Sequence, residues 1–560
     1  MKRPYFLLLL IFLLGTFLRF FALGDIPVSL HRDEAFLGYN AYSILETGRD
    51  ISGSFLPVHL ESFFFSPAGY SYLSIPFIYL FGLNQFAVRF ASALFGSLTI
   101  LLVFLIAIHL FEKDKNKQII ALLSSLLLAI SPWHVNLSRV AVESTIVVFF
   151  ISLGILLYLK YIERKKNLIL SLSFISFAAT FLVYQAPRAF LPTFLPYIAL
   201  TFGGFKKLVQ EKFQVLLYAI LIILPVLFIL FSPSLSWRIQ SLSIFNHPET
   251  KLVIQEQLTI DAIQGLPISL SRIFHNKLIG FSSLFLDNYF AHLSFDFLFS
   301  DGGFPDRFRI PKAGLLYLFE LPLMLFALFA LYKRELKIGV FLSGWILISF
   351  IGSALTFDDI PNLQRTLIAV PAFSILSGYG AMRLWQSVSN IQYRVFSIKL
   401  VRLVAIGYLL FASYNFAYYL IQYHVQGKVY RPWYRQDGYR ELVKKVNELL
   451  PNYEKAVITS RESASTAFFL FYAIYDPKKF QEETKNVDMR KSDHVSFAKY
   501  EFSEEECPLR IDKKINKLTG RKGILYVNSS LCEKEIRGAK LLNAVKRVDN
   551  SQVFYIMHVD

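Results

Sequence analysis

The sequence predicts a polytopic α-helical membrane protein that carries a small extracytoplasmic α/β domain at its C-terminal end. Three observations lead to this prediction: only 18% of the 560 residues are charged, the mean hydropathy is +0.45, and long apolar runs recur between residues 4 and 421. A soluble protein normally carries about 25% charged residues. The composition therefore excludes a soluble enzyme, a secreted disulfide scaffold and a free nucleic-acid-binding protein.

Apolar runs close to the length of about 20 residues that crosses the hydrocarbon predict about eleven spans. The first run follows Met1-Lys2-Arg3 as in a secretory signal, but its apolar part is longer than a signal's, so we predict a retained helix. The spans lie near residues 4–23, 87–111, 119–133, 142–160, 167–185, 188–204, 214–232, 314–331, 338–356, 366–382 and 403–421.

Basic residues give an independent test of which side of the membrane each junction between spans faces. They gather at every second junction, as at 113–117, 164–166 and 333–337. Because cytoplasmic loops are enriched in Lys and Arg, the N-terminus is predicted inside and the C-terminus outside. The net charge of +17 is explained in the same way, as anchoring to anionic lipid rather than binding to nucleic acid. The expected location is a bacterial or archaeal plasma membrane.

Three extracytoplasmic pieces follow from this topology: loops at 24–86 and 233–313, and a tail at 422–560. We therefore divide the chain into a transmembrane domain, 1–421, and an external domain, 422–560. In the tail, 438–450 has the apolar stripe of a helix, and 455–460, 524–528 and 553–559 have the alternation typical of strands. Both cysteines, Cys507 and Cys532, lie there and are either one disulfide or two free thiols.

The most informative stretch begins about eight residues beyond the first span, where Asp33 and Glu34 open an amphipathic segment that ends at Gly48. We expect an interfacial helix with Leu37 and Ala41 on its apolar side. Asp33 is either the N-cap of this helix or a general base held at the lipid–water boundary.

Further charged residues lie at the same predicted face. Arg139 and Glu143 are four apart at the outer end of the fourth span, which predicts one helix face and allows an internal ion pair. Arg188, Lys312 and Arg365 stand on the side where basic residues are disfavoured. Arginines in that position are either interfacial anchors or ligands of an anion such as a lipid phosphate.

The order of these motifs resembles the protein O-mannosyltransferase and lipid A aminoarabinose transferase superfamily of type-C glycosyltransferases. The resemblance covers nearly the whole chain, and the order and spacing of its short motifs carry it. They are Asp33-Glu34 after the first span, the 48–57 segment, Ser66–Leu73, Leu80–Arg89, Ser138–Glu143, Pro361–Thr366 with Pro371, and Tyr434–Tyr439 and Phe471–Pro477 in the tail.

The resemblance implies a transferase that uses a polyprenyl-phosphate-linked monosaccharide at the outer membrane face. Asp33 takes the family's general-base position, with Glu34 beside it and Glu143 as the second acidic site. The matching arginine of the second motif is Arg139, a contact to the donor phosphate.

Residues outside the catalytic motifs match the family less closely. Arg188, Arg365 and Lys312 are further substrate-binding candidates. Glu61 matches the acidic position of a Glu-Lys-Pro segment in the aminoarabinose transferases, but Ser62 stands where the lysine would be. Another basic group must then contact the phosphate. The 233–313 loop is also too short for the β-trefoil insertion of many protein O-mannosyltransferases.

Direct inverting displacement needs few components: a base, cations for the phosphate and an acceptor hydroxyl from a glycan, lipid or protein. No cofactor is evident and no metal cage is readable, so metal dependence stays open. Two alternatives remain, a transporter or flippase of lipid-linked sugars and a ligase or polymerase of lipid-linked glycans. The transporter would carry its charges near the bilayer midplane. A non-catalytic scaffold would not require charges around the first external loop.

Overall fold

Helices form at every position where the sequence predicts a membrane span. Within the described residues, five helices are long and apolar enough to cross a membrane, or six if the bent pair α5 and α6 counts as one span. The figure of eleven spans therefore stays a prediction. The helices at the predicted spans are α1 (Arg3–Phe20), α4 (Gln85–Leu110), α5 (Lys117–Ile130), α6 (Pro132–Ser138), α7 (Glu143–Arg164), α8 (Asn167–Ala179), α9 (Pro187–Gln210), α10 (Lys212–Phe231), α15 (Glu320–Arg334), α16 (Leu336–Ala354), α17 (Val370–Ile391) and α18 (Ile398–Ile421).

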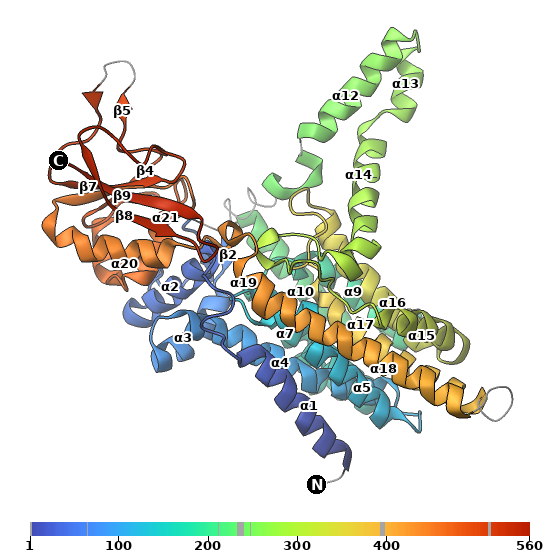
Figure 1. Ribbon diagram of the computed structural model, residues 1–560. Helices are drawn as coiled ribbons and strands as arrows, with labels where there is room; N and C mark the ends of the chain where they lie inside the picture. The colour runs from blue at the N-terminus through green and yellow to red at the C-terminus, as the bar shows by residue number, and fades with distance from the viewer. Residues whose placement is uncertain are drawn as a thin grey trace. The chain divides into compact units, whose positions relative to one another are not determined.

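The computed structural model (Figure 1) describes residues 3–63, 65–210, 212–231, 240–246, 248–391, 398–512 and 517–560. Its contacts divide the chain into two units. The helical unit comprises residues 1–19, 95–137 and 143–420, and the mixed unit comprises 20–94, 138–142 and 421–560. The first external loop and the tail thus belong to the same unit, whereas the 233–313 loop belongs to the helices.

Close contacts between helices hold the helical unit together. A Cβ on Gly378 of α17 would lie 2.4 Å from the Ser124 hydroxyl of α5, and one on Gly380 would lie 2.0 Å from the Leu323 carbonyl of α15. Small residues of this kind let helices approach closely where no hydrophobic effect drives them together. A side chain at either position would push α17 away from a neighbour.

The break between α5 and α6 has a specific cap. The two helices meet at 54°, which leaves carbonyls at the end of α5 without helical partners. The Arg19 guanidinium of α1 donates to the Ala129 carbonyl (3.0 Å) and the Leu128 carbonyl (3.2 Å), and its Nη2 lies 2.7 Å from His134 Nδ1. The buried Arg19 side chain therefore supplies donors to carbonyls that the bend leaves without helical partners. This identifies Arg19 as a structural residue.

The second external loop is helical. It forms α12 (Pro248–Ile263), α13 (Ile268–Phe274) and α14 (Lys277–Ala291), and α12 and α14 run side by side (Figure 1). Gly280 allows the two to touch, because a Cβ there would lie 2.7 Å from Ile254 Cδ1. Many of their apolar side chains remain exposed, among them Ile263, Phe274 and Leu278.

The tail forms a five-stranded mixed sheet in the order β4-β3-β7-β9-β8. The two parallel pairs are β3 with β4 and β3 with β7, and the two antiparallel pairs are β7 with β9 and β9 with β8. The predicted strands and helix are confirmed within one or two residues. The elements are β3 (Lys455–Thr459), β4 (Tyr500–Ser503), β7 (Ile524–Ser529), β8 (Ala539–Lys546), β9 (Gln552–Val559) and the helix α20 (Tyr439–Leu449).

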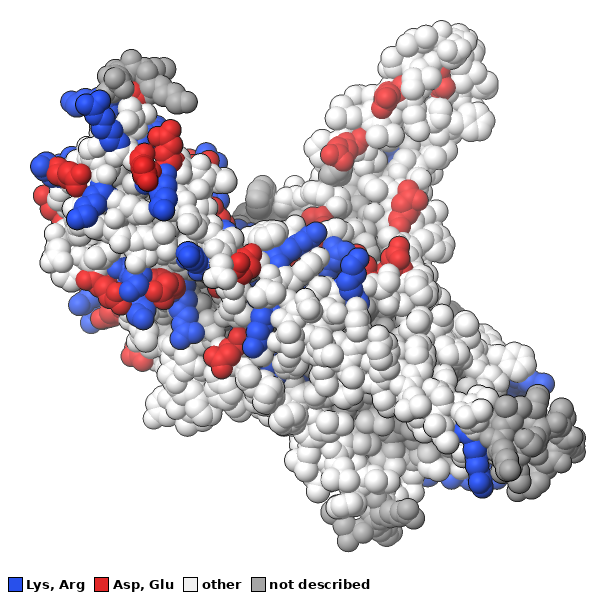
Figure 2. Space-filling model, in the orientation of Figure 1, with Lys and Arg blue, Asp and Glu red and all other residues white. Residues whose placement is uncertain are grey.

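Both faces of this sheet are covered by apolar side chains. On one face Tyr439 of α20 stacks on Phe468 of α21 (Ser465–Tyr472) at 4.2 Å and meets Phe554 of β9 edge-on at 5.1 Å. A second cluster includes Tyr526 and Met557. Cys507 and Cys532 form a disulfide. Figure 2 shows that charged side chains are dense over the tail and sparse over much of the helical surface, in keeping with an extramembrane domain attached to apolar helices.

Candidate functional site

Helix α2 (Arg32–Thr47), which carries the first acidic motif, begins with a capping box formed by His31 and Glu34. The Asp33 N–H donates to His31 Nδ1 (3.2 Å), and the His31 N–H donates to Glu34 Oε2 (3.0 Å). Gly48 ends the helix with a φ of 68°, as predicted. The N-cap interpretation of Asp33 is therefore wrong, because His31 occupies that position.

Protein rather than an open interface surrounds much of α2. Residues 34–41 are all buried, and Leu37 and Ala41 are 2% and 0% exposed. The Ser71 hydroxyl of α3 (Gly69–Phe81) donates to the Leu37 carbonyl, and the Tyr39 hydroxyl donates to the Tyr475 carbonyl of the tail. The expectation that the apolar side faces lipid is corrected: it packs against α3, α21 and α22 (Pro477–Glu483) within the mixed unit.

The Glu34 carboxylate is fully occupied. Oε1 accepts from Arg89 Nε (2.9 Å) and the Ala141 N–H (2.8 Å), while Oε2 accepts from Arg89 Nη2 (3.2 Å) and the His31 N–H (3.0 Å). Burial raises the pKa of Glu34, but the Arg89 charge and these hydrogen bonds outweigh it and hold the pKa below its usual value. Glu34 is thus ionised at neutral pH and has no lone pair directed at a substrate.

Arg89 and Glu34 form a buried anchor, and Arg89 also holds the chain segment that leads into α2. Its guanidinium also donates to the carbonyls of Pro27 (2.8 Å), Ser29 (2.7 Å) and Leu23 (3.2 Å). The side chain is 0% exposed, so each of these bonds is made away from water. In the sequence, Arg89 stands out only as the last residue of the Leu80–Arg89 motif. An arginine inside an apolar span was the signal that could have found it.

Asp33 differs from its neighbour because its carboxylate stays accessible. The side chain is 40% exposed, with Oδ2 3.3 Å from His31 Nδ1 and Oδ1 3.9 Å from Arg32 Nε. The Arg32 N–H donates to Gln436 Oε1 of the tail (2.8 Å), which fixes the backbone beside Asp33. Of the two adjacent acids, Asp33 is the one that can meet a substrate hydroxyl.

The structure separates Arg139 from the helix that begins at Glu143. Helix α6 ends at Ser138 and α7 starts at Glu143, so the predicted shared helix face is wrong. The intervening backbone is bonded elsewhere: the Ala141 N–H donates to Glu34 and the Val142 N–H to the Ser92 hydroxyl. These contacts interrupt the helix and bring the second motif beside the first.

The Arg139 guanidinium is itself buried among acceptors. It donates to the carbonyls of Phe21 (2.7 Å) and Ile26 (3.0 Å) and to the Tyr423 hydroxyl (3.2 Å), with its charge over the Tyr423 ring. The side chain is 0% exposed. This environment favours a positioning role for Arg139, and its predicted contact to the donor phosphate stays a prediction.

Arg435 is a cation near Glu34 that was not among the candidates predicted from the sequence. It ends the short 3₁₀ turn Pro432–Arg435 within electrostatic reach of Tyr423, Arg89 and Glu34. Burial lowers its pKa, and no hydrogen bond or ion pair joins its side chain to the described part of the chain. Glu61 lies apart from this group, near Asp50 and Arg490, on which its charge acts.

In the helical unit, Arg365 belongs to a rigid loop that follows α16. Its guanidinium donates to the Thr356 hydroxyl (2.7 Å) and pairs with Asp358 (2.9 Å). The Asn362 side chain accepts from the Gln364 N–H (3.0 Å) and the Arg365 N–H (2.8 Å). Each bond fixes the loop beside Arg365.

A buried histidine anchors this loop. His292, at the end of α14, accepts from the Asn362 N–H (3.0 Å) through Nε2, and its Nδ1 lies 2.7 Å from the Asn288 carbonyl. These partners place the proton on Nδ1. Burial lowers the pKa of His292 to about 4, and Arg365 contributes, so the ring is neutral. No spacing in the sequence links His292 to this loop.

Two of the remaining candidates lie near the Arg365 loop. Glu143 Oε2 accepts from Gln364 Nε2 (3.5 Å), which brings Glu143 to the residue next to Arg365. Arg188 Nε and Nη1 are buried and have no hydrogen-bond partner among the described residues. Lys312 is exposed on a turn with a φ of 54°. The structure therefore brings Glu143 beside the loop of Arg365, and Glu34 to the backbone of the 138–142 segment.

Metal dependence stays open. Across the described ranges, no group of three or more His, Cys, Asp or Glu side chains is arranged to hold a metal ion.

Comparisons with known proteins agree with this architecture. The family model for dolichyl-phosphate-mannose-protein mannosyltransferases matches residues 66–237. The apo structure of ArnT from Cupriavidus metallidurans superposes with a TM-score of 0.52 at 11% identity, covering 98% of this chain and 97% of that chain. Its complex with undecaprenyl phosphate gives 0.53 at 13% identity over the same shares. The chain has the type-C glycosyltransferase fold.

This result confirms the resemblance inferred from the motifs and the interpretation as a membrane protein with transmembrane helices. An uncharacterised protein of Aquifex aeolicus is 28% identical over 183 residues, which are 32% of this chain and 35% of that protein. The chain thus matches about a third of the length of this curated relative.

Proposed function

We propose that the chain transfers a monosaccharide from a polyprenyl-phosphate donor to an acceptor hydroxyl at the outer face of the plasma membrane, with inversion of the anomeric centre. The observation that carries this proposal is the contrast between Asp33 and Glu34. Glu34 is buried and fully hydrogen-bonded, whereas Asp33 keeps 40% of its side chain exposed on a backbone fixed from both sides. The fold, shared with an ArnT bound to undecaprenyl phosphate, supports a lipid-linked donor.

In the proposed reaction, the acceptor oxygen attacks the anomeric carbon and the bond from that carbon to the phosphate oxygen breaks. The Asp33 carboxylate accepts the hydroxyl proton, and the polyprenyl phosphate leaves with the bonding electrons. General-base catalysis of this kind contributes about 10²–10⁴-fold to rate. Glu34 and Arg89 act as positioning residues that hold the backbone of Asp33.

Cations with unused donors are the proposed phosphate ligands. Arg435, in the unit that carries Asp33, fits this role, because its side chain makes no hydrogen bond or ion pair within the described ranges. In the helical unit, Arg188 is a separate candidate, because its Nε and Nη1 are buried there without acceptors among the described residues. Arg365 and Arg139 already donate to protein groups, so they position their loops. Lys312 and Glu61 remain candidates for contacts to the substrate, and Glu143 for the second acidic site.

The disulfide supports the proposed orientation. Disulfides persist outside the cytoplasm, so Cys507–Cys532 fits a tail on the outer side. The residues that line the site determine which sugar and which acceptor it binds. Mannose is one of the sugars to test.

The test is transfer by purified protein in liposomes with a panel of radiolabelled polyprenyl-phosphate monosaccharides and cell-envelope extracts as acceptors. We expect Asp33→Asn to lower transfer at least about 100-fold. Glu46→Gln, on an exposed position of the same helix, should leave it unchanged. Retention of more than a tenth of the activity by Asp33→Asn would overturn the base assignment. Movement of the donor between leaflets without transfer would favour a transporter.

A further inference from the structure

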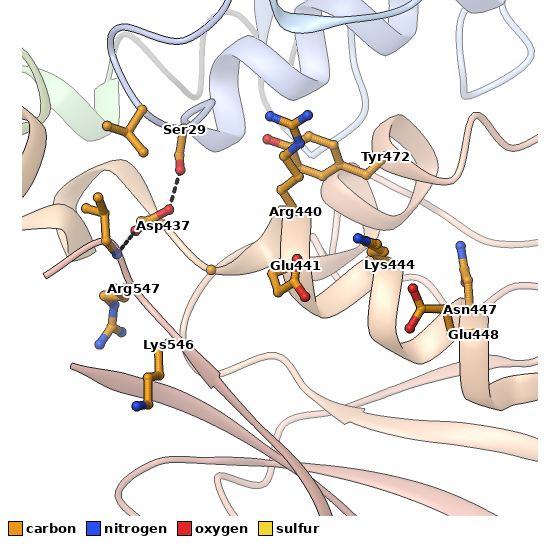
Figure 3. A pocket seen from close by; sticks show the side chains of 13 residues that line it. Ser29, Asp437, Arg440, Glu441, Lys444, Asn447, Glu448, Tyr472, Lys546 and Arg547 are labelled. Carbon is orange, nitrogen blue, oxygen red and sulfur yellow. Dashed lines mark hydrogen bonds between the residues drawn. The ribbon is translucent and has the colours of Figure 1, made fainter. Parts of the chain in front are cut away.

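The parts of the two units that lie outside the predicted spans present different surfaces. In the mixed unit, helix α20 and the end of β8 border a cavity of about 960 Å³ that holds acids and bases together (Figure 3). Its charged lining residues include Asp437, Glu441, Glu448, Arg440, Lys444 and Lys546. Interspersed charges of both signs are typical of a surface that faces water. The α12–α14 hairpin of the helical unit differs, because large apolar side chains dominate its end.

The end of this hairpin, residues 260–279, is named here the hairpin tip. It comprises the last turn of α12, the whole of α13 and the start of α14, and it extends away from the other helices of its unit (Figure 1). Its large apolar side chains that are 45–77% exposed are Ile260, Ile263, Ile268, Leu270, Ile273, Phe274, Leu278 and Ile279. An exposed apolar cluster of this kind marks a contact with a membrane or with another protein.

The polar groups of the hairpin tip are bonded within it. Asp261, the one acid of the tip, accepts from the Ser271 hydroxyl and lies 2.6 Å from His275 Nδ1. The Asn276 side chain donates to the carbonyls of residues 272 and 273 and caps the first turn of α14. A tip that faced water would not need these internal bonds, because water would supply the partners.

The backbone of the turn between α12 and α13 is bonded in the same way. The N–H groups of residues 264–266 donate to the carbonyls of residues 260–262 at 2.9–3.1 Å, and residue 267 is a proline without an N–H. Lipid offers no hydrogen-bond partners, so a segment that contacts acyl chains must satisfy its own donors. The hairpin tip meets this requirement and thereby favours lipid over water.

The base of the hairpin is fixed to a helix that is long and apolar enough to span the membrane. The Tyr289 hydroxyl of α14 donates to the Leu347 carbonyl of α16 (2.9 Å), and the Asn288 amide donates to the carbonyls of Ala354 (3.3 Å) and Thr356 (2.9 Å). The Leu347 side chain is 41% exposed. The hairpin therefore leaves the unit beside an apolar, exposed part of a predicted span.

An apolar stripe of α14 connects this base to the hairpin tip. Ile279, Leu286 and Phe290 are spaced seven and four residues apart, which places them on one face of the helix. Each of the three side chains is 45–61% exposed. Exposed apolar surface thus continues from α16 along α14 to the tip, as expected of a hairpin that stays in contact with lipid over its length.

The charge of the hairpin tip suits the headgroups of anionic lipids. Arg272 and Lys277, both exposed, stand against the single acid Asp261, so the tip has more positive than negative charge. Long basic side chains can keep their apolar stems among acyl chains while their charges reach the headgroups. Anionic lipids attract basic residues at this depth.

We propose that the hairpin tip is inserted into the outer leaflet of the membrane at the boundary between headgroups and acyl chains. Its apolar side chains lie among the acyl chains, and Arg272 and Lys277 lie at anionic headgroups. The hairpin is then an attachment to lipid in addition to the spans. Because α14 ends beside His292, which accepts from the Asn362 N–H, this attachment is connected to the loop that carries Arg365.

The test is electron paramagnetic resonance of full-length protein in nanodiscs of phosphatidylcholine and phosphatidylglycerol, with a nitroxide on Ile263→Cys or Leu278→Cys. The native cysteines form a disulfide, so the introduced thiol takes the label. Power saturation compares collisions with oxygen, which dissolves in lipid, and with a water-soluble nickel chelate. We expect the oxygen-to-nickel ratio at both tip positions to be at least about fivefold higher than at Val487→Cys, an exposed apolar residue of the tail.

Two results would overturn the inference. Equal ratios at the hairpin tip and at Val487 would place the tip in water. Protection of the tip from both oxygen and nickel would place protein against it instead of lipid, and spin–spin broadening that disappears in nanodiscs with one copy would identify that protein as a second copy of the chain.

The headgroup assignment has its own control. Omitting phosphatidylglycerol should lower the ratio at Ile263→Cys, and Arg272→Gln combined with Lys277→Gln should remove this dependence. A ratio that does not respond to phosphatidylglycerol would overturn the role of the two cations. The inference does not depend on the transferase proposal, so Asp33→Asn should leave every ratio unchanged.

Discussion

The segment that carries Asp33 and the loop that carries Arg365 are each held by a buried anchor, but the first anchor is charged and the second is neutral. Glu34 and Arg89 form an ion pair at 2.9 Å that is almost closed to solvent. His292 is equally enclosed, yet it holds Asn362 as a neutral ring with one donor and one acceptor. Each anchor orders a loop whose neighbouring charged residue is a candidate for function.

This difference predicts that the two anchors are sensitive to different changes. A buried ion pair binds strongly only while both partners are present, and removal of one leaves a charge without compensation. A neutral ring has no such charge to expose, but it must remain deprotonated. The ion pair is therefore vulnerable to substitution, and the histidine to mild acid.

The largest effect should come from breaking the ion pair. Glu34→Gln leaves the Arg89 charge buried and should destabilise the mixed unit by about 3–5 kcal/mol. Because Glu34 also accepts from the Ala141 N–H, amide exchange in residues 138–142 should accelerate. The measurements are thermal unfolding and hydrogen exchange in detergent. Arg89→Met combined with Glu34→Met should recover part of the loss, and a cost below about 1 kcal/mol for Glu34→Gln would contradict the charged-anchor interpretation.

The next effect concerns pH at the neutral anchor. The pKa of His292 is about 4 in the fold and about 6.5 when unfolded, so the unfolded chain binds the proton first. Stability is complete above about pH 6.5 and should fall by about 1.4 kcal/mol per pH unit until about pH 4. Glu34, with its lowered pKa, keeps its contribution throughout this range and loses it only at lower pH.

Hydrogen exchange of residues 356–366 between pH 7 and pH 5 measures this dependence. His292→Gln, which keeps a donor and an acceptor without a titrating ring, should flatten it. If the variant and the wild type respond to acid alike, the neutral anchor is not the cause.

The smallest expected effect on stability is that of replacing Arg188, which differs in this respect from the residues of both anchored loops. Because its buried nitrogens have no partners, Arg188→Met should leave the unfolding temperature unchanged or raise it. If Arg188 binds the donor phosphate, the same change should raise KM for the donor about 10- to 100-fold, which corresponds to about 1.4–2.7 kcal/mol. Arg365→Met should instead lower stability. Destabilisation by Arg188→Met with unaltered KM would assign it to packing.

Local patterns were readable from the sequence. The helix that ends at Gly48, the α20 stripe and the strands of the tail follow from spacing and turn residues, and all formed where predicted. Asp33 and Glu34 were found as a pair, but the sequence could not distinguish them. Their difference depends on Arg89, which is 55 positions away from Glu34, and on the Ala141 N–H, 107 positions away.

The errors share one cause, which is tertiary contact overriding a local rule. Spacing of four predicted one helix for Arg139 and Glu143, but the backbone between them donates to Glu34 and Ser92 instead. The apolar side of α2 was assigned to lipid because only the fold shows that α3 and the tail cover it.

The arginine that caps the bend between α5 and α6 constrains how the chain is made. Arg19 finds its carbonyl partners 109 and 110 residues later in the sequence. At about 5–20 residues per second, translation reaches them about 5–20 s after Arg19 itself. During that interval the first helix carries an unshielded charge at the membrane, which costs about 2.5–3.5 kcal/mol at the centre of a helix and less toward its end. Nascent α1 should therefore stay beside the translocon or a chaperone until α5 emerges.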